Sequence, residues 1–271
     1  MAAMSLSLFH RIQACIQVCD PQTKCSLTQQ LASDWNTDAV PFIEGMDEPE
    51  PIGEAGRPEQ PELVAARQVP RRNINTEQGR IVLAHALAHI EFNAINLALD
   101  AAYRFRNMPR QYYSDWLKVA AEEAYHFTLL RQYLIDRGQD YGAYPAHNGL
   151  WEMAQKTAHD VMVRMALVPR VLEARGLDVT PGLIARLKQA GDEAFVAHLE
   201  IIHRDEIGHV AIGSHWFKYV CEQRGLDARA TFKQLIQQYM QGSLRGPFDE
   251  TARLQAGFSQ QELADLAALE L

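Results

Sequence analysis

The residues with the clearest chemistry in this chain are glutamates and histidines that recur in two matching patterns. Each pattern is one Glu followed, after 31 or 32 residues, by Glu-x-x-His. The members are Glu91, Glu123 and His126 in the first copy, and Glu173, Glu206 and His209 in the second. Carboxylates and imidazoles in this number bind pairs of iron or manganese ions in the cores of helical bundles. The spacing therefore predicts a dinuclear metal site.

The helical phase of these residues supports the prediction, because each glutamate falls inside an apolar helix face. Around Glu123 and His126 the same face carries Trp116, Val119, Leu130 and Leu134, and around Glu206 and His209 it carries Phe195, Leu199, Ile202, Gly213 and Trp216. A buried, unpaired carboxylate is very costly, so four of them need shared compensation. Internal ion pairs with arginine are the alternative, but the arginines do not share these faces in matching numbers. A pair of divalent cations would balance four carboxylates.

Other acidic and histidine residues lie close enough in sequence to assist the site. Glu200 and His203 form a further Glu-x-x-His, but it lies about 60–120° round the helix from the preferred pair, at ~100° per residue. Metal-bound imidazoles usually donate their other N–H to a carboxylate or a carbonyl. Supporting residues are therefore sought among Asp205, Glu122, Glu200 and His203.

His85 and His89 have the i, i+4 spacing that can bind zinc. His89 lies about 200° from Glu91 round the helix, so it cannot join the same site. We expect these two histidines to form a pair at the surface or at an interface.

The chain is predicted to be all-α, because helical periodicity dominates and no alternating strand pattern with hairpin turns occurs. Residues 5–36 read as helical, with a stop at Asp20-Pro21 and a second helix starting after Ser26. Longer helices are predicted over 76–106, 110–137, 150–175 and 192–224, followed by shorter ones at 228–241 and after Ser259. Glycines 138, 176 and 225 mark helix ends, and Ser259 to Glu262 forms a capping box.

Composition divides the chain into four stretches and limits its partners. We expect an N-terminal helical segment at 1–36, a Pro-rich acidic strap at 37–75 lying on the surface, a helical bundle at 76–225, and a helical tail at 226–271. The net charge of −8 argues against sequence-blind DNA or RNA binding. The sequence contains no run of 18 apolar residues, so no membrane span is expected. The N-terminus lacks the pattern of a signal peptide. We therefore expect a cytoplasmic protein. Its four cysteines form no Cys-x-x-Cys, which argues against a zinc ribbon or a thioredoxin-type motif and favours structural thiols.

At its two Glu/Glu-x-x-His halves the chain resembles the ferritin-like superfamily of di-iron carboxylate proteins, over about residues 76–224. The resemblance implies a ferritin-like four-helix bundle with an N-terminal helical extension and C-terminal helices. It also implies that the six residues bind two irons, with Glu123 and Glu206 as bridges, although manganese or a mixed pair suits the same ligands. The segments around Glu91, Gly56-Arg57-Pro58 and Arg204 to Trp216-Phe217 resemble a bacterial ferritin-like family of unknown function. A more distant likeness is to the di-iron tRNA hydroxylase.

These resemblances favour an oxygen-activating oxidase or monooxygenase that acts on a small molecule with dioxygen. Iron handling or structural metal binding is the main alternative, and an RNA-modifying hydroxylase is a further one, although no basic, aromatic-interleaved segment supports RNA binding. A purely helical interaction protein with internally paired charges is a third class. The exposed faces of the helices at 76–106 and 110–137 are compatible with a homodimer. No motif in the sequence identifies the substrate.

Overall fold

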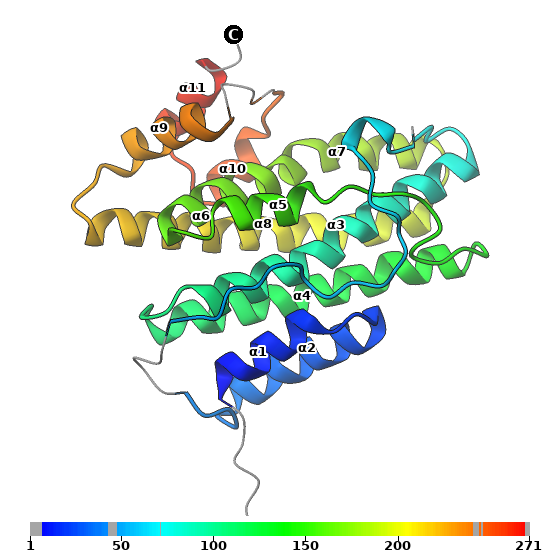
Figure 1. Cartoon of the computed structure of the whole chain (residues 1–271). Helices are drawn as coiled ribbons and strands as arrows, with labels where there is room; N and C mark the ends of the chain where they lie inside the picture. The colour runs from blue at the N-terminus through cyan, green and yellow to red at the C-terminus, as the bar shows by residue number, and fades with distance from the viewer. Residues whose placement is uncertain (1–6, 43–47, 71, 241–243, 245, 269–271) are drawn as a thin grey trace, which may run out of the picture. The chain divides into compact units, whose positions relative to one another are not determined.

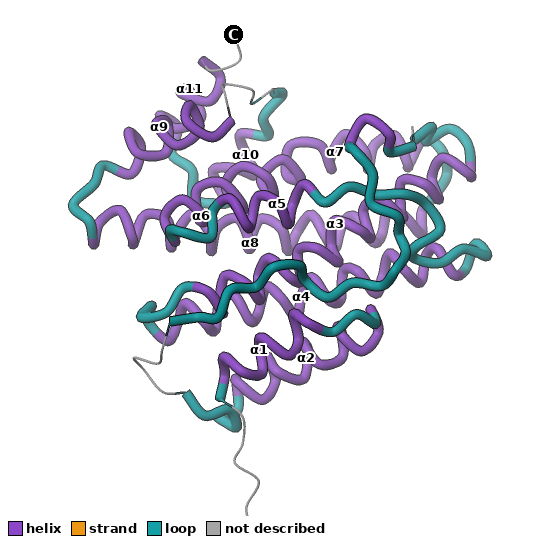
Figure 2. Tube along the Cα trace, in the orientation of Figure 1, coloured by secondary structure: helices purple, strands orange, loops and turns teal. Residues whose placement is uncertain are grey.

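The computed structural model describes residues 7–42, 48–70, 72–240, 244 and 246–268. Within those residues every regular element is helical, and the only strand-like pairing is a single bridge between Leu63 and Ala146. The all-α prediction is therefore confirmed (Figure 2). Close contacts divide the chain into two compact units, residues 1–155 and 156–271. Each unit is described by itself below.

The first unit is built on a pair of long helices, α3 and α4, which lie side by side (Figure 1). Its helices are α1 (Leu8–Gln17), α2 (Pro21–Asn36), α3 (Glu77–Arg104), α4 (Arg110–Ile135) and α5 (Gly149–Lys156), with the unit boundary inside α5. Helix α1 packs on α3, and α2 packs on α4. The prediction of a helix start after Ser26 is wrong, because the Asp20 side chain accepts the Thr23 N–H (2.8 Å) and caps α2 with Pro21 as its first residue.

The described part of the Pro-rich strap is hydrogen-bonded to this unit; residues 43–47 and 71 lie outside the described residues. The Gly56 N–H donates to the Ile16 carbonyl at the end of α1 (2.8 Å), and the Trp151 indole N–H donates to the Gly53 carbonyl (2.9 Å). Further along, Val64 and Ala146 are joined by a backbone hydrogen bond of 2.8 Å. The strap is therefore an ordered surface layer, drawn as loop in Figure 2 apart from the short 3-10 helix η1 (Ala66–Gln68).

Helix α3 is apolar enough to raise the question of a membrane span. Among the described helices it alone meets the length and hydropathy of one, with a mean hydropathy of 1.3, but 83% of that window is buried inside the protein. A buried core helix passes the same test, and α3 behaves as one. Its face of Ala84, Ala88, Glu91, Ile95 and Ala98 is buried throughout, as predicted.

A buried lysine joins three elements of the first unit. The Lys24 ammonium, on α2, donates to the Ile16 carbonyl (2.7 Å) and to the Asn96 side-chain oxygen on α3, and the side chain is fully buried. The end of α1 favours a cation because helix C-termini carry partial negative charge. Burial nevertheless lowers the pKa of Lys24 to about 7.

We expect this lysine to make the first unit more stable as the pH rises from 7.0 to 8.5. The unfolded chain keeps its Lys24 proton in this range and the folded chain releases it, so the unfolded state binds more protons and the free energy of unfolding increases. The expected gain is about 1.5 kcal/mol, which Lys24→Met should lack. Urea unfolding at both pH values measures it. Equal gains in the two proteins would contradict the prediction. Higher pH is avoided because Cys25, whose pKa is raised by burial to about 11, contributes the opposite slope.

The second unit is formed by a segmented helix packed against the long helix α8. In chain order its elements are α6 (Val161–Leu167), η2 (Val168–Glu173), α7 (Ala174–Gln189), α8 (Glu193–Gln223), α9 (Ala228–Met240), α10 (Glu250–Gln255) and α11 (Gln260–Ala268). Helices α6 and α7 and the η2 turn all pack on α8. Around Ser259 the predicted capping box is confirmed: the Ser259 hydroxyl accepts the Glu262 N–H (3.2 Å), and the Glu262 carboxylate accepts the Ser259 N–H (2.8 Å).

The prediction of one helix over 150–175 is wrong in three respects. The chain first breaks at Thr157–Asp160, where the Asp160 side chain caps α6 by accepting the Met162 N–H (2.7 Å). It then widens into a π-helical turn, η2, because Pro169 has no N–H to donate and its ring clashes with the carbonyl four residues earlier. The Ala174 N–H accordingly donates to the Pro169 carbonyl, five residues back. Helix α7 then continues past Gly176 to Gln189, and α10 was also not predicted.

Candidate metal centre

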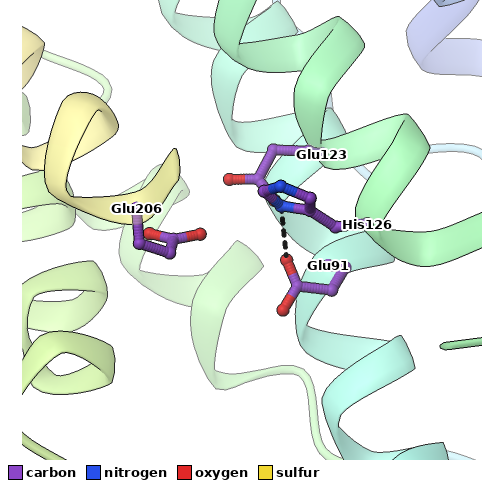
Figure 3. Close-up of side chains that lie close together, drawn as sticks. All are labelled: Glu91, Glu123, His126 and Glu206. Atoms are coloured by element: carbon purple, nitrogen blue, oxygen red, sulfur yellow. Dashed lines mark hydrogen bonds and ion pairs between the residues drawn. The ribbon is translucent and has the colours of Figure 1, made fainter. Parts of the chain in front are cut away.

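The first half of the predicted site assembles inside the first unit. Glu91 comes from the middle of α3, and Glu123 and His126 come from one face of α4. Each offers one ligand atom, and those atoms lie within 4.8 Å of one another. The His126 Nδ1 atom is 3.4 Å from a Glu123 carboxylate oxygen and 3.6 Å from one of Glu91 (Figure 3). Figure 3 also labels Glu206, which belongs to the second unit.

Burial and close approach shift the pKa values of the ionisable groups in this half of the site. Glu123 and His126 are fully buried and Glu91 is only 5% exposed. Burial, and then the neighbouring Glu123 carboxylate, hold the pKa of Glu91 well above its usual value. Burial alone would lower the pKa of His126, but the carboxylates of Glu123 and Glu91 outweigh it and raise the pKa to about 11. Both shifts favour protonation of the cluster when no metal is bound, and a divalent cation would displace those protons.

The second half repeats the internal geometry of the first within the second unit. The His209 Nδ1 atom is 3.5 Å from a Glu206 carboxylate oxygen, which matches the 3.4 Å between His126 and Glu123. His209 is fully buried and Glu206 is 13% exposed. Glu173 closes the η2 turn and is half-buried, with one carboxylate oxygen sealed from solvent. The two Glu-x-x-His motifs thus present the same pair of ligand atoms from two different helices.

This donor set fits a hard or borderline divalent cation. Carboxylate oxygen and imidazole nitrogen are the ligands that iron, manganese and zinc accept in proteins. In the first half the Glu91 Oε2 atom is buried, and its contact with the His126 Nδ1 atom, at 3.6 Å, is longer than a normal hydrogen bond. A buried carboxylate oxygen without a donor loses several kcal/mol of solvation, by order of magnitude, which coordination to a cation would restore. The residues present therefore suit a metal site.

The candidate supporting residues lie mostly in other interactions. Asp205 is bound by the adjacent Arg204 (2.8 Å), Glu122 lies 3.7 Å from Lys118, and Glu200 pairs with Lys188 (2.8 Å) at an exposed position. The His203 side chain is half-buried, and burial lowers its pKa. A role for these residues beside the metal stays a prediction.

The expectation that His85 and His89 form a surface pair is wrong. Both are buried, at 1% and 6% exposure, beneath the loop that follows α4. The His85 Nε2 atom accepts the Gly142 N–H (2.9 Å), and His89 lies between the Tyr141 hydroxyl (2.8 Å) and the His147 carbonyl (3.1 Å). Burial lowers the pKa of each to about 4, so both stay neutral and hold the loop in place.

Two features near the predicted ligands were not anticipated from the sequence. One is the π-helical turn that ends at Glu173, for which Pro169 inside a helical pattern was the available signal. The other is Arg170, a buried arginine in the same turn that pairs with Glu262 of α11. No local pattern links those two residues, which are 92 positions apart.

The fold and the cluster define an all-helical protein with a buried carboxylate–imidazole group that could hold a metal ion. The chain belongs to the family described as "Protein of unknown function (DUF455)", whose model matches residues 17–264. It is similar to an uncharacterized protein of Haemophilus influenzae, at 46% identity over 273 residues that cover 97% of this chain and 94% of that protein. No solved structure matches the chain significantly.

Proposed function

We propose that the chain is a ferritin-like dinuclear metal protein, with iron as the preferred metal, that uses dioxygen to oxidise a small substrate. The cluster of Glu91, Glu123 and His126 carries the proposal, because two carboxylates and an imidazole, all buried, offer ligand atoms within 4.8 Å of one another. The equivalent geometry of Glu206 and His209, together with Glu173, supplies the second half of the ligand set. We also propose that the helices at 76–225 form one bundle, which brings the two halves of the ligand set together.

The roles of the chain's own residues follow from their chemistry. Glu91, Glu123, Glu173 and Glu206 would hold the two ions through their carboxylates, and Glu123 and Glu206 each lie one turn before a histidine of the same set. His126 and His209 would fix the geometry as neutral ligands, which requires loss of the proton that His126 holds in the metal-free cluster. A bound ferrous pair supplies electrons for dioxygen reduction. A monooxygenase would also need an external reductant, whereas an oxidase takes its electrons from the substrate.

The test is metal content followed by reactivity. Protein produced with both iron and manganese available is expected to contain about two metal ions per chain by elemental analysis. After anaerobic loading with ferrous iron, addition of dioxygen should cause rapid uptake that metal-free protein does not show. Stoichiometric metal without dioxygen uptake would instead indicate a structural metal site. Many irons per chain would indicate storage, and a folded chain without metal would refute the proposal.

A further inference from the structure

Three contacts within the second unit hold the η2 turn, which ends at Glu173, and the start of α7 after it. The first is Pro169, whose ring packs directly on Gly213 of α8. A Cβ atom added at Gly213 would lie closer to the Pro169 ring than the 3.0 Å that real Cβ atoms keep. Only glycine lets α8 approach the turn this closely.

The second contact encloses Arg170, the next residue. Its guanidinium is fully buried and lies over three aromatic rings, at 4.8 Å from Phe217, 4.0 Å from Phe232 and 4.5 Å from Phe258. Its charge is balanced by Glu262, which also closes the capping box of α11. Within the described residues the Nε and Nη1 atoms of Arg170 have no hydrogen-bond acceptor, so the ring faces are their partners.

The third contact lies just beyond the turn and again comes from the C-terminal segment. Arg253 of α10 binds the Asp178 carboxylate through two hydrogen bonds of 2.8 Å and reaches the Ala174 carbonyl (3.4 Å). Arg253 is 3% exposed, so this pair is also buried. Residues 249–266, which we call the C-terminal clasp, therefore bind the chain on both sides of Glu173. They contact Arg170 before it and Asp178 after it.

These three contacts affect Glu173, the proposed metal ligand at the end of the turn. A π-turn is rarely stable by itself and persists where the surroundings determine it. We propose that the Pro169–Gly213 contact and the C-terminal clasp position the Glu173 carboxylate, and so determine whether the second half of the metal site binds its ion. This inference rests on the proposed dinuclear function. Arg170 and Glu262 are positioning residues in it, since they act through the turn that ends at Glu173.

The test compares two glycine substitutions in the full-length chain. Gly213→Ala forces the Pro169 ring and the turn away from α8, whereas Gly176→Ala, three residues after Glu173, adds a methyl group with nothing within 4 Å. Gly213→Ala is expected to weaken manganese or ferrous binding by about tenfold or more, as changes next to metal ligands do. It should also speed amide hydrogen exchange over 168–173 in metal-free protein. Gly176→Ala should change neither quantity.

The outcomes distinguish failure of the positioning role from failure of the proposed dinuclear function. Wild-type metal affinity and stoichiometry in a folded Gly213→Ala protein would overturn the positioning role and leave the dinuclear proposal intact. A wild-type chain that binds no metal would overturn both. If Gly213→Ala does not fold, Glu262→Gln decides, because it preserves shape and removes the charge facing Arg170. Weakened binding of one ion would then support the inference, and unchanged binding of both would refute it.

Discussion

Replacement of Glu123 by alanine is expected to abolish nearly all metal binding and, with it, the stabilisation that metal gives the folded chain. Glu123 is fully buried, lies 3.4 Å from His126 and is a proposed ligand in the centre of the cluster. Metal present at ~1,000 times its dissociation constant stabilises the folded state by about 4 kcal/mol. For a chain of this size that corresponds to a rise in Tm on the order of 10 °C, which the variant should lack.

Asp115→Ala provides the matched control for this experiment. Asp115 is a carboxylate on the same helix, about two turns before Glu123, and its half-buried side chain accepts a hydrogen bond of 2.7 Å from Gln111. Elemental analysis and thermal unfolding with and without added metal should show two ions and the full shift in the control. In Glu123→Ala both should be close to zero. Full metal content in Glu123→Ala would contradict the assignment, whatever the control shows.

The helix faces that carry the candidate ligands could be predicted because their signal is local and periodic. In α4 the predicted face of Trp116, Val119, Glu123, His126, Leu130 and Leu134 is buried throughout. The spacing of Glu123 and His126 puts them one turn apart, so their mutual contact follows from helix geometry alone. The meeting of Glu91 with that pair was inferred from charge, since buried carboxylates need compensation. The structure brings those three residues together.

What the sequence did not reveal depends on contacts between distant residues. Gly176 was taken as the end of a helix, but Asp178, just beyond it, is held by Arg253, 75 residues later. A tertiary contact of this kind outweighs the weak preference of glycine for helix ends. The environment of Arg170 likewise comes from helices α8, α9 and α11, which no local window contains. The two histidines of α3 were misplaced because the loop that covers them has no periodic signal.

The second large effect is expected at Gly56 in the Pro-rich strap. Its role depends on a contact with residues far away in the sequence. Gly56 lies against the end of α1, and a Cβ atom there would meet the backbone of Gln17 and Val18 below 3.0 Å. Backbone atoms cannot move aside as a flexible side chain can. The Gly56 N–H also donates to the Ile16 carbonyl, which accepts the Lys24 ammonium as well. Gly56→Ala should therefore separate the strap from α1 and disturb the lysine that joins α1, α2 and α3.

We expect Gly56→Ala to lower the free energy of unfolding of the first unit by about 1–3 kcal/mol, the usual range for overpacking that forces backbone shifts. Gly53→Ala, three residues earlier in the strap, is the control. Nothing lies within 4 Å of its added methyl group, and its carbonyl can still accept the Trp151 N–H. The control should be neutral or slightly stabilising, because alanine restricts the unfolded chain. Urea unfolding followed by tryptophan fluorescence measures both variants. Equal stabilities would mean that the strap is not held at Gly56, and that Lys24 is ordered by α2 and α3 alone.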